Sequence, residues 1–460
     1  MKKLFLFTFY ILLATNAFSQ EKVFEYDPVG VEPNRSITAS FQISNPTDSS
    51  KAIFIIETNS IHGLFCDKNF QVLKKIVFNQ DMKECCSYLG YSIQDKKCHL
   101  LFVSRNKKDL YSVCFDPDKD IAVGSIVSFM NPESITEDFY ISDIIHSSCL
   151  HLLYISRNSS IVKLYKIQSP NKVVYQEFDL SAYQNLYNRT GNKNLFELFR
   201  FPRAISLSDR KIASYKSDIF YDLDQTFYPT KVYSYQNHII LTLDADNSGT
   251  IILDIDSDKD TAILKRIDHS FAGKPEKSKT KSASYYYQNA LLQVKSSKKS
   301  MAFSVHDVTS ESLLAFYKLD KNSAEIPFVN LPFIAEGKGL RAQEYDSPRK
   351  TLRRLWKVTP SLSAYSFNDT LEIKFGGYKY FSGGMSLSEY AFIYSIGLFD
   401  PLSFNHLEGK VIPNPFIDMY ELSHRRMDLI SGETKFQAGE NFYYGFFDKQ
   451  NHKYFLYKFD

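Results

Sequence analysis

Two segments of this sequence match closely: HLLFVSRN at 99–106 and HLLYISRN at 151–158. Six of the eight positions are identical, the other two are conservative, and the offset is 52 residues. Each copy passes through a polar turn into a second apolar stretch, Leu110 to Phe115 in the first and Ile161 to Ile167 in the second. A strand, a tight polar turn and a second strand make a β-hairpin. The repeat therefore predicts a fold built from successive hairpins.

Fainter copies of this hairpin occur along the rest of the chain. In each copy, two short apolar stretches flank a turn rich in Asp, Asn, Gly, Ser or Lys. A less regular region, Thr370 to Phe404, brings the count to about seven units, with six to eight as the range. The paired stretches are Ile53–Glu57 with Phe70–Phe78, His238–Asp244 with Thr250–Ile255, Leu291–Val294 with Met301–Val305, and Phe442–Phe447 with Lys453–Phe459.

The composition also favours sheet. Sustained helical periodicity is nearly absent, and short helical turns are expected only around Ser181 to Leu186 and Asn194 to Phe199. The chain has 31 Tyr and 38 Phe but one Trp, and Tyr and Phe fit the half-buried surface of a sheet. Such rings can also stack on sugars, but we favour packing between strands. The predicted fold class is all-β.

The strand-turn-strand units, at roughly the 40–50 residue spacing of four-stranded blades, resemble the β-propeller superfamily. The N-terminal apolar run that ends in Ala17-Phe18-Ser19-Gln20, typical of an export signal, and the richness in Lys, Tyr, Phe and Asn are similar to those of secreted propeller proteins of the Bacteroidota. The resemblance covers residues 50–460 and implies about seven four-stranded blades. We assign 20–460 to the propeller domain, with 20–50 as a candidate separate entry strand segment. A β-sandwich after 21–45 followed by a smaller propeller is the alternative. No Trp-Asp signature or kelch double glycine recurs, so no family's functional residues carry over.

The N-terminus has the plan of a cleaved secretory signal peptide. Lys2 and Lys3 precede an apolar run, and Ala17-Phe18-Ser19 places small residues before a cleavage site at Gln20. The run is too short to span a bilayer, which needs about 20 residues, and no later stretch predicts a transmembrane helix. We therefore expect residues 1–19 to be removed and the protein to be exported to the periplasm, the cell surface or the medium.

Removal of the signal peptide leaves a nearly neutral protein. Lys plus Arg falls from 55 to 53 against 52 acidic residues, so the mature formal charge is +1. Such a balance gives no general attraction to nucleic acid, and no nucleic-acid partner is predicted.

All six cysteines lie in the first third of the chain. An even number in an exported protein is compatible with disulfides, and six cysteines allow 15 pairings between which sequence does not choose. Buried free thiols are the other interpretation. Spacing of the Cys-x-x-Cys type is absent, which gives no sign of a zinc site. The residues are Cys66, Cys85, Cys86, Cys98, Cys114 and Cys149.

Two acidic stretches have partial metal-site patterns. Asp244, Asp246 and Ser248 precede Gly249 as in a calcium loop, but Ile255 stands where a bidentate Glu belongs. A hairpin turn explains the first stretch without a metal. The alternating Asp254, Asp256, Asp258 and Asp260 could share one face of a strand and attract a cation, but a solvated loop is the favoured interpretation.

The densest positive stretch is Arg349 to Lys357, which also contains the only tryptophan, Trp356. It could grip an acidic polymer, with Trp356 stacking on a sugar or base and Arg353 or Arg354 pairing with carboxylate or phosphate. The interpretation that we favour is a strand with Leu and Trp in the core and the cations in water. Another cluster, which comprises Lys274, Lys277, Lys279 and Lys281, is typical of a surface loop.

No catalytic, cofactor-binding or metal-binding residue is assigned from the sequence, and no cofactor is predicted. His99 and His151 recur at matching positions, which indicates a structural role. The nucleophile elbow, metal-helix, phosphate-loop and dinucleotide motifs are all absent. We therefore predict an exported binding or scaffold protein whose partner is a protein, a peptide or a glycan. The alternative is a hydrolase or lyase acting on polysaccharide, because such enzymes need only suitably placed carboxylates.

Overall fold

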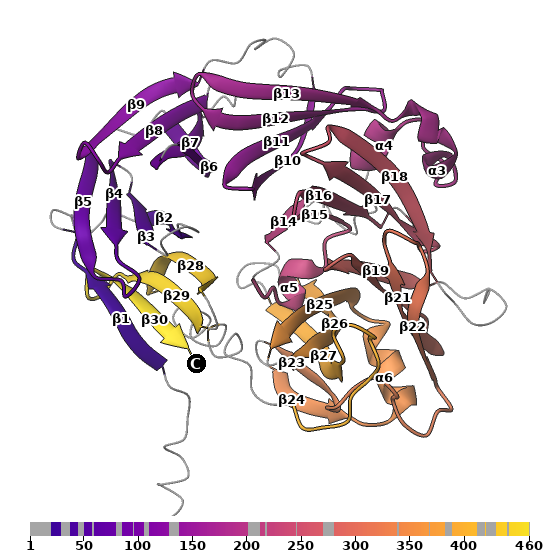
Figure 1. Ribbon diagram of the computed structural model, residues 1–460. Coiled ribbons are helices and arrows are strands. Elements are labelled where there is room, and N and C mark those ends of the chain that lie inside the picture. The colour runs from indigo at the N-terminus through magenta and orange to yellow at the C-terminus, as the bar shows by residue number, and fades with distance from the viewer. Residues whose placement is uncertain are drawn as a thin grey trace, which may run out of the picture. The chain divides into compact units, whose positions relative to one another are not determined.

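A computed structural model describes most of the chain, and Figure 1 shows it as a series of small sheets. The expected signal peptide, 1–19, and Lys274, Lys277 and Lys279 lie outside the described residues. The described residues are 20–28, 37–44, 50–57, 59–79, 85–94, 96–104, 110–127, 138–200, 212–216, 219–244, 246–269, 280–337, 340–367, 369–381, 389–411, 419, 429–438 and 441–459.

The chain forms two compact units. The first comprises residues 1–88, 95–126 and 413–460, and the second comprises 89–94 and 127–412. The strands β6 Cys85–Gln94 and β9 Ile121–Val127 belong partly to each unit. The strands that lie wholly in the first unit are β1 Gln20–Tyr26, β2 Ile37–Ser44, β3 Lys51–Glu57, β4 Ser60–Cys66, β5 Val72–Asn79, β7 Lys97–Ser104, β8 Leu110–Asp116, β28 Ile430–Ala438, β29 Asn441–Asp448 and β30 Lys453–Phe459.

The second unit contains the other strands and the short helices. Its strands are β10 Phe139–His146, β11 Cys149–Ile155, β12 Ile161–Ser169, β13 Lys172–Asp179, β14 Ala213–Lys216, β15 Thr230–Tyr235, β16 His238–Leu243, β17 Gly249–Asp256, β18 Thr261–Asp268, β19 Lys281–Tyr287, β20 Ala290–Ser296, β21 Ser300–Asp307, β22 Leu313–Asp320, β23 Phe333–Gly337, β24 Leu340–Tyr345, β25 Thr359–Phe367, β26 Thr370–Phe381 and β27 Glu389–Phe399. Its helices are η2 Ser181–Tyr183, α3 Gln184–Asn188, α4 Leu195–Arg200, α5 Leu223–Thr226 and α6 Pro348–Leu355.

The strands form seven sheets of four or five strands, and the protein is a seven-bladed β-propeller. In the first five blades, strands adjacent in sequence lie side by side, and β14 pairs in parallel with β15. The predicted fold class and blade number are confirmed. In order, the seven blades are β2-β3-β4-β5, β6-β7-β8-β9, β10-β11-β12-β13, β14-β15-β16-β17-β18, β19-β20-β21-β22, β24-β23-β27-β26-β25 and β1-β30-β29-β28.

The described residues of the matching octapeptides, 99–104 and 151–158, begin at equivalent places in two blades. HLLFVSRN begins within β7 and HLLYISRN within β11, and each strand pairs with the next one in the chain. Asn158 has a left-handed φ of 55°, so the second copy uses its Ser-Arg-Asn stretch as a turn, as predicted. The predicted hairpins around 244–250, 294–301 and 447–453 are confirmed, and so are the helical turns near 181–186 and 194–199.

One predicted hairpin is wrong. The turn at Asp67-Lys68-Asn69 joins β4 to β5, whereas the sequence pairing assigned Ile53–Glu57 as its first strand. The strand β4 was missed because His62 and Gly63 interrupt its apolar pattern. A Cβ on Gly63 would lie 2.9 Å from the Phe115 ring, so the small residue is required where two strands' side chains crowd together.

The seventh blade combines the two ends of the described chain. Its outer strand is β1, which pairs antiparallel with β30 from Gln20↔Phe459 to Tyr26↔Tyr454. An ion pair joins Glu25 to Lys453 across this pairing. Segment 20–50 thus contributes β1 to the seventh blade and β2 to the first.

The sixth blade departs from the repeated plan. Its outer strands β23 and β24 come first in sequence, then α6, and only then the inner strands β25, β26 and β27. The helix α6 contacts β24 and also β22 of the fifth blade (Figure 1). The insertion β24–α6 therefore places a helix beside two blades of the second unit.

None of the described helices is long and apolar enough to cross a membrane.

Candidate functional site

A basic pocket of about 760 Å³ lies at the insertion β24–α6. Its walls come from the β20–β21 turn, from β24, from α6 and from the two residues after α6. Five of its lining residues are cationic, and Glu344 is its one acidic residue. We call this cavity the α6 pocket; its lining residues are Lys298, Gln343, Glu344, Tyr345, Lys350, Arg353, Arg354, Trp356 and Lys357.

The basic segment forms this helix, and the favoured prediction of a strand is wrong. Pro348 occupies the first turn, where its missing N–H costs no hydrogen bond. Leu352 and Leu355 are buried and belong to the hydrophobic core of the second unit. The pocket cations Lys350, Arg353 and Arg354 are exposed and follow the i, i+3, i+4 spacing of one helical face, and the exposed Lys357 comes two residues after the helix. This spacing was visible in the sequence, but eight residues are few for a periodicity argument.

The pocket cations lack ionic partners. Among the described residues, none of the five has a carboxylate oxygen within 4.0 Å. Buried cations of the same unit are paired instead: Lys231 lies 3.4 Å from Asp244, and Lys374 lies 2.7 Å from Asp222. Several like charges around one cavity repel one another, and an anion in the cavity would relieve this repulsion.

Trp356 supplies an aromatic surface at the pocket. Its indole is half-buried, and the Nζ of Lys281 and of Lys298 lie 5.2 and 5.9 Å from the ring centroid. Lys281 also donates hydrogen bonds to the carbonyls of Trp356 and Val358, at 2.9 and 2.8 Å. Burial, and secondarily the charge of Lys379, lowers the pKa of Lys281 below its usual value. Lys281 therefore anchors the end of α6, whereas Lys298 extends from an exposed turn.

The second aromatic residue of the pocket is already engaged. Tyr345 is buried, and its hydroxyl donates to Oε1 of Gln343 at 2.5 Å. The Arg354 guanidinium lies over the Tyr345 ring, 5.4 Å from its centroid. Trp356 is therefore the ring of the pocket that is available to a ligand.

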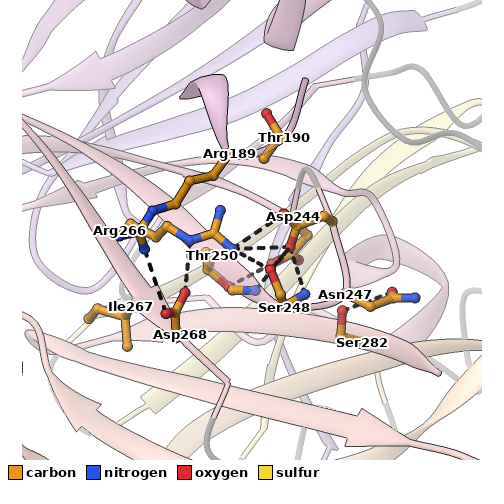
Figure 2. A network of polar contacts seen from close by, with 12 residues as sticks. Arg189, Thr190, Asp244, Asn247, Ser248, Thr250, Arg266, Ile267, Asp268 and Ser282 are labelled. Carbon is orange, nitrogen blue, oxygen red and sulfur yellow. Dashed lines mark hydrogen bonds and ion pairs between the residues drawn. The ribbon is translucent and has the colours of Figure 1, made fainter. Parts of the chain in front are cut away.

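The calcium-like stretch forms a network that protein groups satisfy (Figure 2). Asp246 accepts hydrogen bonds from the backbone N–H groups of Ser248 and Gly249, and Arg266 lies 3.3 Å from the same carboxylate. Burial alone would raise the pKa of Asp246, but the Ser248 hydrogen bonds and the Arg266 charge outweigh it and lower the pKa. Asp244 accepts instead from Lys231 and Thr250. The network holds the β16–β17 turn and leaves no open ligand set.

The carboxylates of the second acidic stretch also do not gather into a metal site. Strand β17 ends at Asp256, so Asp258 and Asp260 lie in the following turn and do not continue one strand face. Asp254 bonds His238, and Asp258 bonds Asn237. Within the described part of the chain, no group of three His, Cys, Asp or Glu residues is placed to hold a metal ion.

The acidic stretch instead contains a turn that recurs in several blades. This recurrence was not predicted from the sequence. In each case an Asp at the end of a strand accepts hydrogen bonds from backbone N–H groups two to four residues later. A residue with positive φ follows three or four positions after the Asp. The sequence contains a pattern that indicates this recurring turn, because DPDKD at 116–120 resembles DSDKD at 256–260. The six Asp residues are Asp67, Asp116, Asp256, Asp307, Asp400 and Asp448.

The matching histidines are buried, in agreement with a structural role. His99 lies beside Ser112 of the neighbouring strand, at 3.4 Å. Nδ1 of His151 donates to the Cys149 carbonyl at 3.1 Å, and its Nε2 has no hydrogen-bond partner among the described residues. Burial lowers the pKa of His151 to about 3, so this ring is neutral.

Four cysteines are free thiols. Cys66, Cys98 and Cys149 are buried and Cys114 is half-buried. Burial raises the pKa of each thiol above its usual value, which disfavours the reactive thiolate. Free thiols are therefore the correct interpretation for these four residues, while the side chains of Cys85 and Cys86 lie outside the described set.

Comparison with known proteins adds only distant structural likenesses. No family model matches the chain, and no curated protein matches its sequence. A DUF4221-family protein from Bacteroides vulgatus aligns over 94% of this chain and 99% of its own, with 10% identity and a TM-score of 0.32. The Dos1 propeller aligns over 91% and 81%, with 9% identity and a TM-score of 0.32. An ACO/RPE65 chimera aligns over 64% of each chain, at 10% identity and a TM-score of 0.31. Our chain thus spans less than two thirds of that chimera, and none of these likenesses supplies a site residue.

Proposed function

We propose that the chain is an exported propeller that binds an anionic ligand in the α6 pocket. The observation that carries this proposal is the convergence of five cations without carboxylate partners on one cavity that also contains the only tryptophan. Cavities of about 300–1,000 Å³ are the usual size of ligand sites, and the α6 pocket, at about 760 Å³, falls within that range.

The origin of the cations supports binding to an anion over a purely structural role for them. Arg353 and Arg354 lie in the last helical turn, where the helix dipole favours positive charge, so the dipole accounts for part of their placement. It does not account for Lys298, which comes from the fifth blade and meets the same cavity. Cations delivered by separate elements to one hollow are typical of an anion site.

Export rests on the N-terminal sequence. The plan of residues 1–19 is that of a signal peptide, and β1 begins at Gln20, the residue expected to follow the cleavage site. Cleavage there would leave every described strand intact. The mature N-terminus of the exported protein, read by mass spectrometry, tests this part of the proposal, and a retained leader would contradict it.

The pocket favours binding over hydrolysis of a glycosidic bond. Hydrolysis needs two carboxyl groups about 5–9.5 Å apart, and Glu344 is the only carboxylate that lines the α6 pocket. Polysaccharide cleavage therefore has no support from this cavity.

Because the chain has a single tryptophan, its fluorescence reports ligand binding at the α6 pocket. We expect fluorescence titration of the full chain with polygalacturonate, dextran sulfate and inorganic polyphosphate to shift the Trp356 emission, with affinity falling as salt rises. Arg353→Gln/Arg354→Gln should weaken binding at least tenfold, because it removes two charges from the pocket. Its matched control, Arg349→Gln/Lys299→Gln, removes two exposed charges that do not line the pocket and should change affinity less than twofold. Equal affinities for the two double variants, or no response to any polyanion, would overturn the proposal.

A further inference from the structure

We infer that the ligand of the α6 pocket is a segment of an acidic polysaccharide, with a sugar ring stacked on Trp356 and its acidic groups paired with the surrounding cations. This inference rests on the proposed anion-binding function and names its substrate class. It is carried by three observations: the position of Trp356 among cations, the spacing of the cations along α6, and the local extent of the positive charge.

The first observation is the combination of an aromatic ring with cations beside it. Trp356 is half-buried, and Lys298 extends from an exposed turn to within 5.9 Å of the ring centroid. A sugar ring stacked on the indole would therefore carry its carboxylate or sulfate next to an ammonium group. A small inorganic anion would use the cations but gain nothing from the indole.

The second observation is that the cations are spread over a distance. Lys350 lies in the first turn of α6, and Lys357 lies two residues after the helix ends, seven residues further along the chain. Arg353 and Arg354 lie between them. This row suits a ligand that carries several anionic groups in sequence, and Arg can bind carboxylate or sulfate with two parallel hydrogen bonds.

The third observation argues against nucleic acid. Proteins that bind nucleic acid carry extended basic surfaces, because affinity comes from many phosphate contacts. The full chain here has a formal charge of only +3, and the row on α6 is its densest positive stretch. One aromatic platform with a short cationic row therefore fits a few acidic sugars better than a polynucleotide.

The test compares charged and uncharged polymers of the same sugar by calorimetry on the full chain. We expect polygalacturonate or dextran sulfate to bind at least tenfold more tightly than the matched neutral polymer, methyl-esterified polygalacturonate or dextran. Whether the carboxylated or the sulfated polymer binds better identifies the acidic group. Trp356→Ala should weaken binding of the acidic polysaccharide at least tenfold and change polyphosphate affinity less than twofold. Trp356→Phe keeps a ring and should retain most of the affinity, and thermal unfolding checks that both variants fold.

The outcomes separate this inference from the proposed function. If polyphosphate or single-stranded DNA binds as tightly as both acidic polysaccharides and Trp356→Ala has no effect, the inference fails while anion binding stands. If neither acidic polysaccharide exceeds its neutral counterpart but polyphosphate binds, the inference again fails alone. If no polyanion binds, both fail.

Discussion

At the scale of single residues, repeated aspartates stabilise the turns of the propeller. Asp448 shows how: it is almost fully buried and accepts from the backbone N–H groups of Gln450 and Asn451, at 2.8 and 3.1 Å. The turn then needs a left-handed residue, and His452 has a φ of 55°. A carboxylate that satisfies these N–H groups allows a tight turn with an ordinary L-residue at the left-handed position.

Asp448→Ala should lower the free energy of unfolding by about 1–2 kcal/mol, because two backbone N–H groups of the turn lose their acceptor. Denaturant unfolding of the purified chain measures this loss. Asp448→Asn keeps one acceptor oxygen and should cost less. Asp118→Ala is the control, since that exposed side chain accepts no hydrogen bond from the described residues, and its effect should stay within about 0.5 kcal/mol. Equal effects of the two alanine variants would show that the turn carboxylate is unimportant.

At the scale of elements, one face of α6 packs in the hydrophobic core and stabilises the fold, and the other face lines the α6 pocket. Leu352 is fully buried, whereas Arg353 beside it in sequence is exposed at the pocket. Leu352→Ala should therefore destabilise the protein by about 2–5 kcal/mol, as is usual for a core leucine. Substitutions on the basic face should not destabilise the protein in this way.

The electrostatic potential of that face can be measured without a ligand. Iodide should quench Trp356 fluorescence more strongly than caesium does, because five cations concentrate anions at the pocket. Arg353→Gln/Arg354→Gln should reduce iodide quenching severalfold and leave neutral acrylamide quenching nearly unchanged. Caesium quenching equal to that of iodide would contradict a positive pocket.

The secondary-structure elements also show which parts of the fold and of the site could be predicted from the sequence. The octapeptide repeat and the local hairpins predicted the fold class and the blade number, because each hairpin is set by residues close in sequence. The order β23, β24, α6, β25 was not predictable in the same way, since β23 pairs with β27 rather than with its successor alone. Likewise the basic segment was recognised as a candidate, but Lys298 was not, because only the fold brings the fifth blade to α6.

At the scale of the whole molecule, buried neutral histidines predict sensitivity to mild acid. Burial lowers the pKa of His151 to about 3 and of His269 to about 4, against about 6.5 in an unfolded chain. Between these values the unfolded state binds more protons than the folded state, so stability falls as pH falls from about 6.5 toward 4. Urea midpoints at pH 7, 6 and 5 should decrease in that order.

His151→Leu isolates one contribution, because it removes a group that only the unfolded state protonates in this range. The variant should lose less stability between pH 7 and 5 than the parent, by up to about 2 kcal/mol, since each pKa unit is worth about 1.4 kcal/mol. An unchanged pH slope in the variant would contradict the neutral, buried state of this ring.

The pairing of β1 with β30 has a consequence for the order of events in biosynthesis. Glu25 leaves the ribosome early, and Lys453, its partner in the seventh blade, follows 428 residues later. The strand β1 thus waits for β30, and long-range pairing of this kind is intrinsically slow. A chain released before its final strand would expose unpaired strand edges, which invite association with other chains. The pairing of β1 with β30 therefore completes the seventh blade, and a chain interrupted before β30 is left open to aggregation and proteolysis.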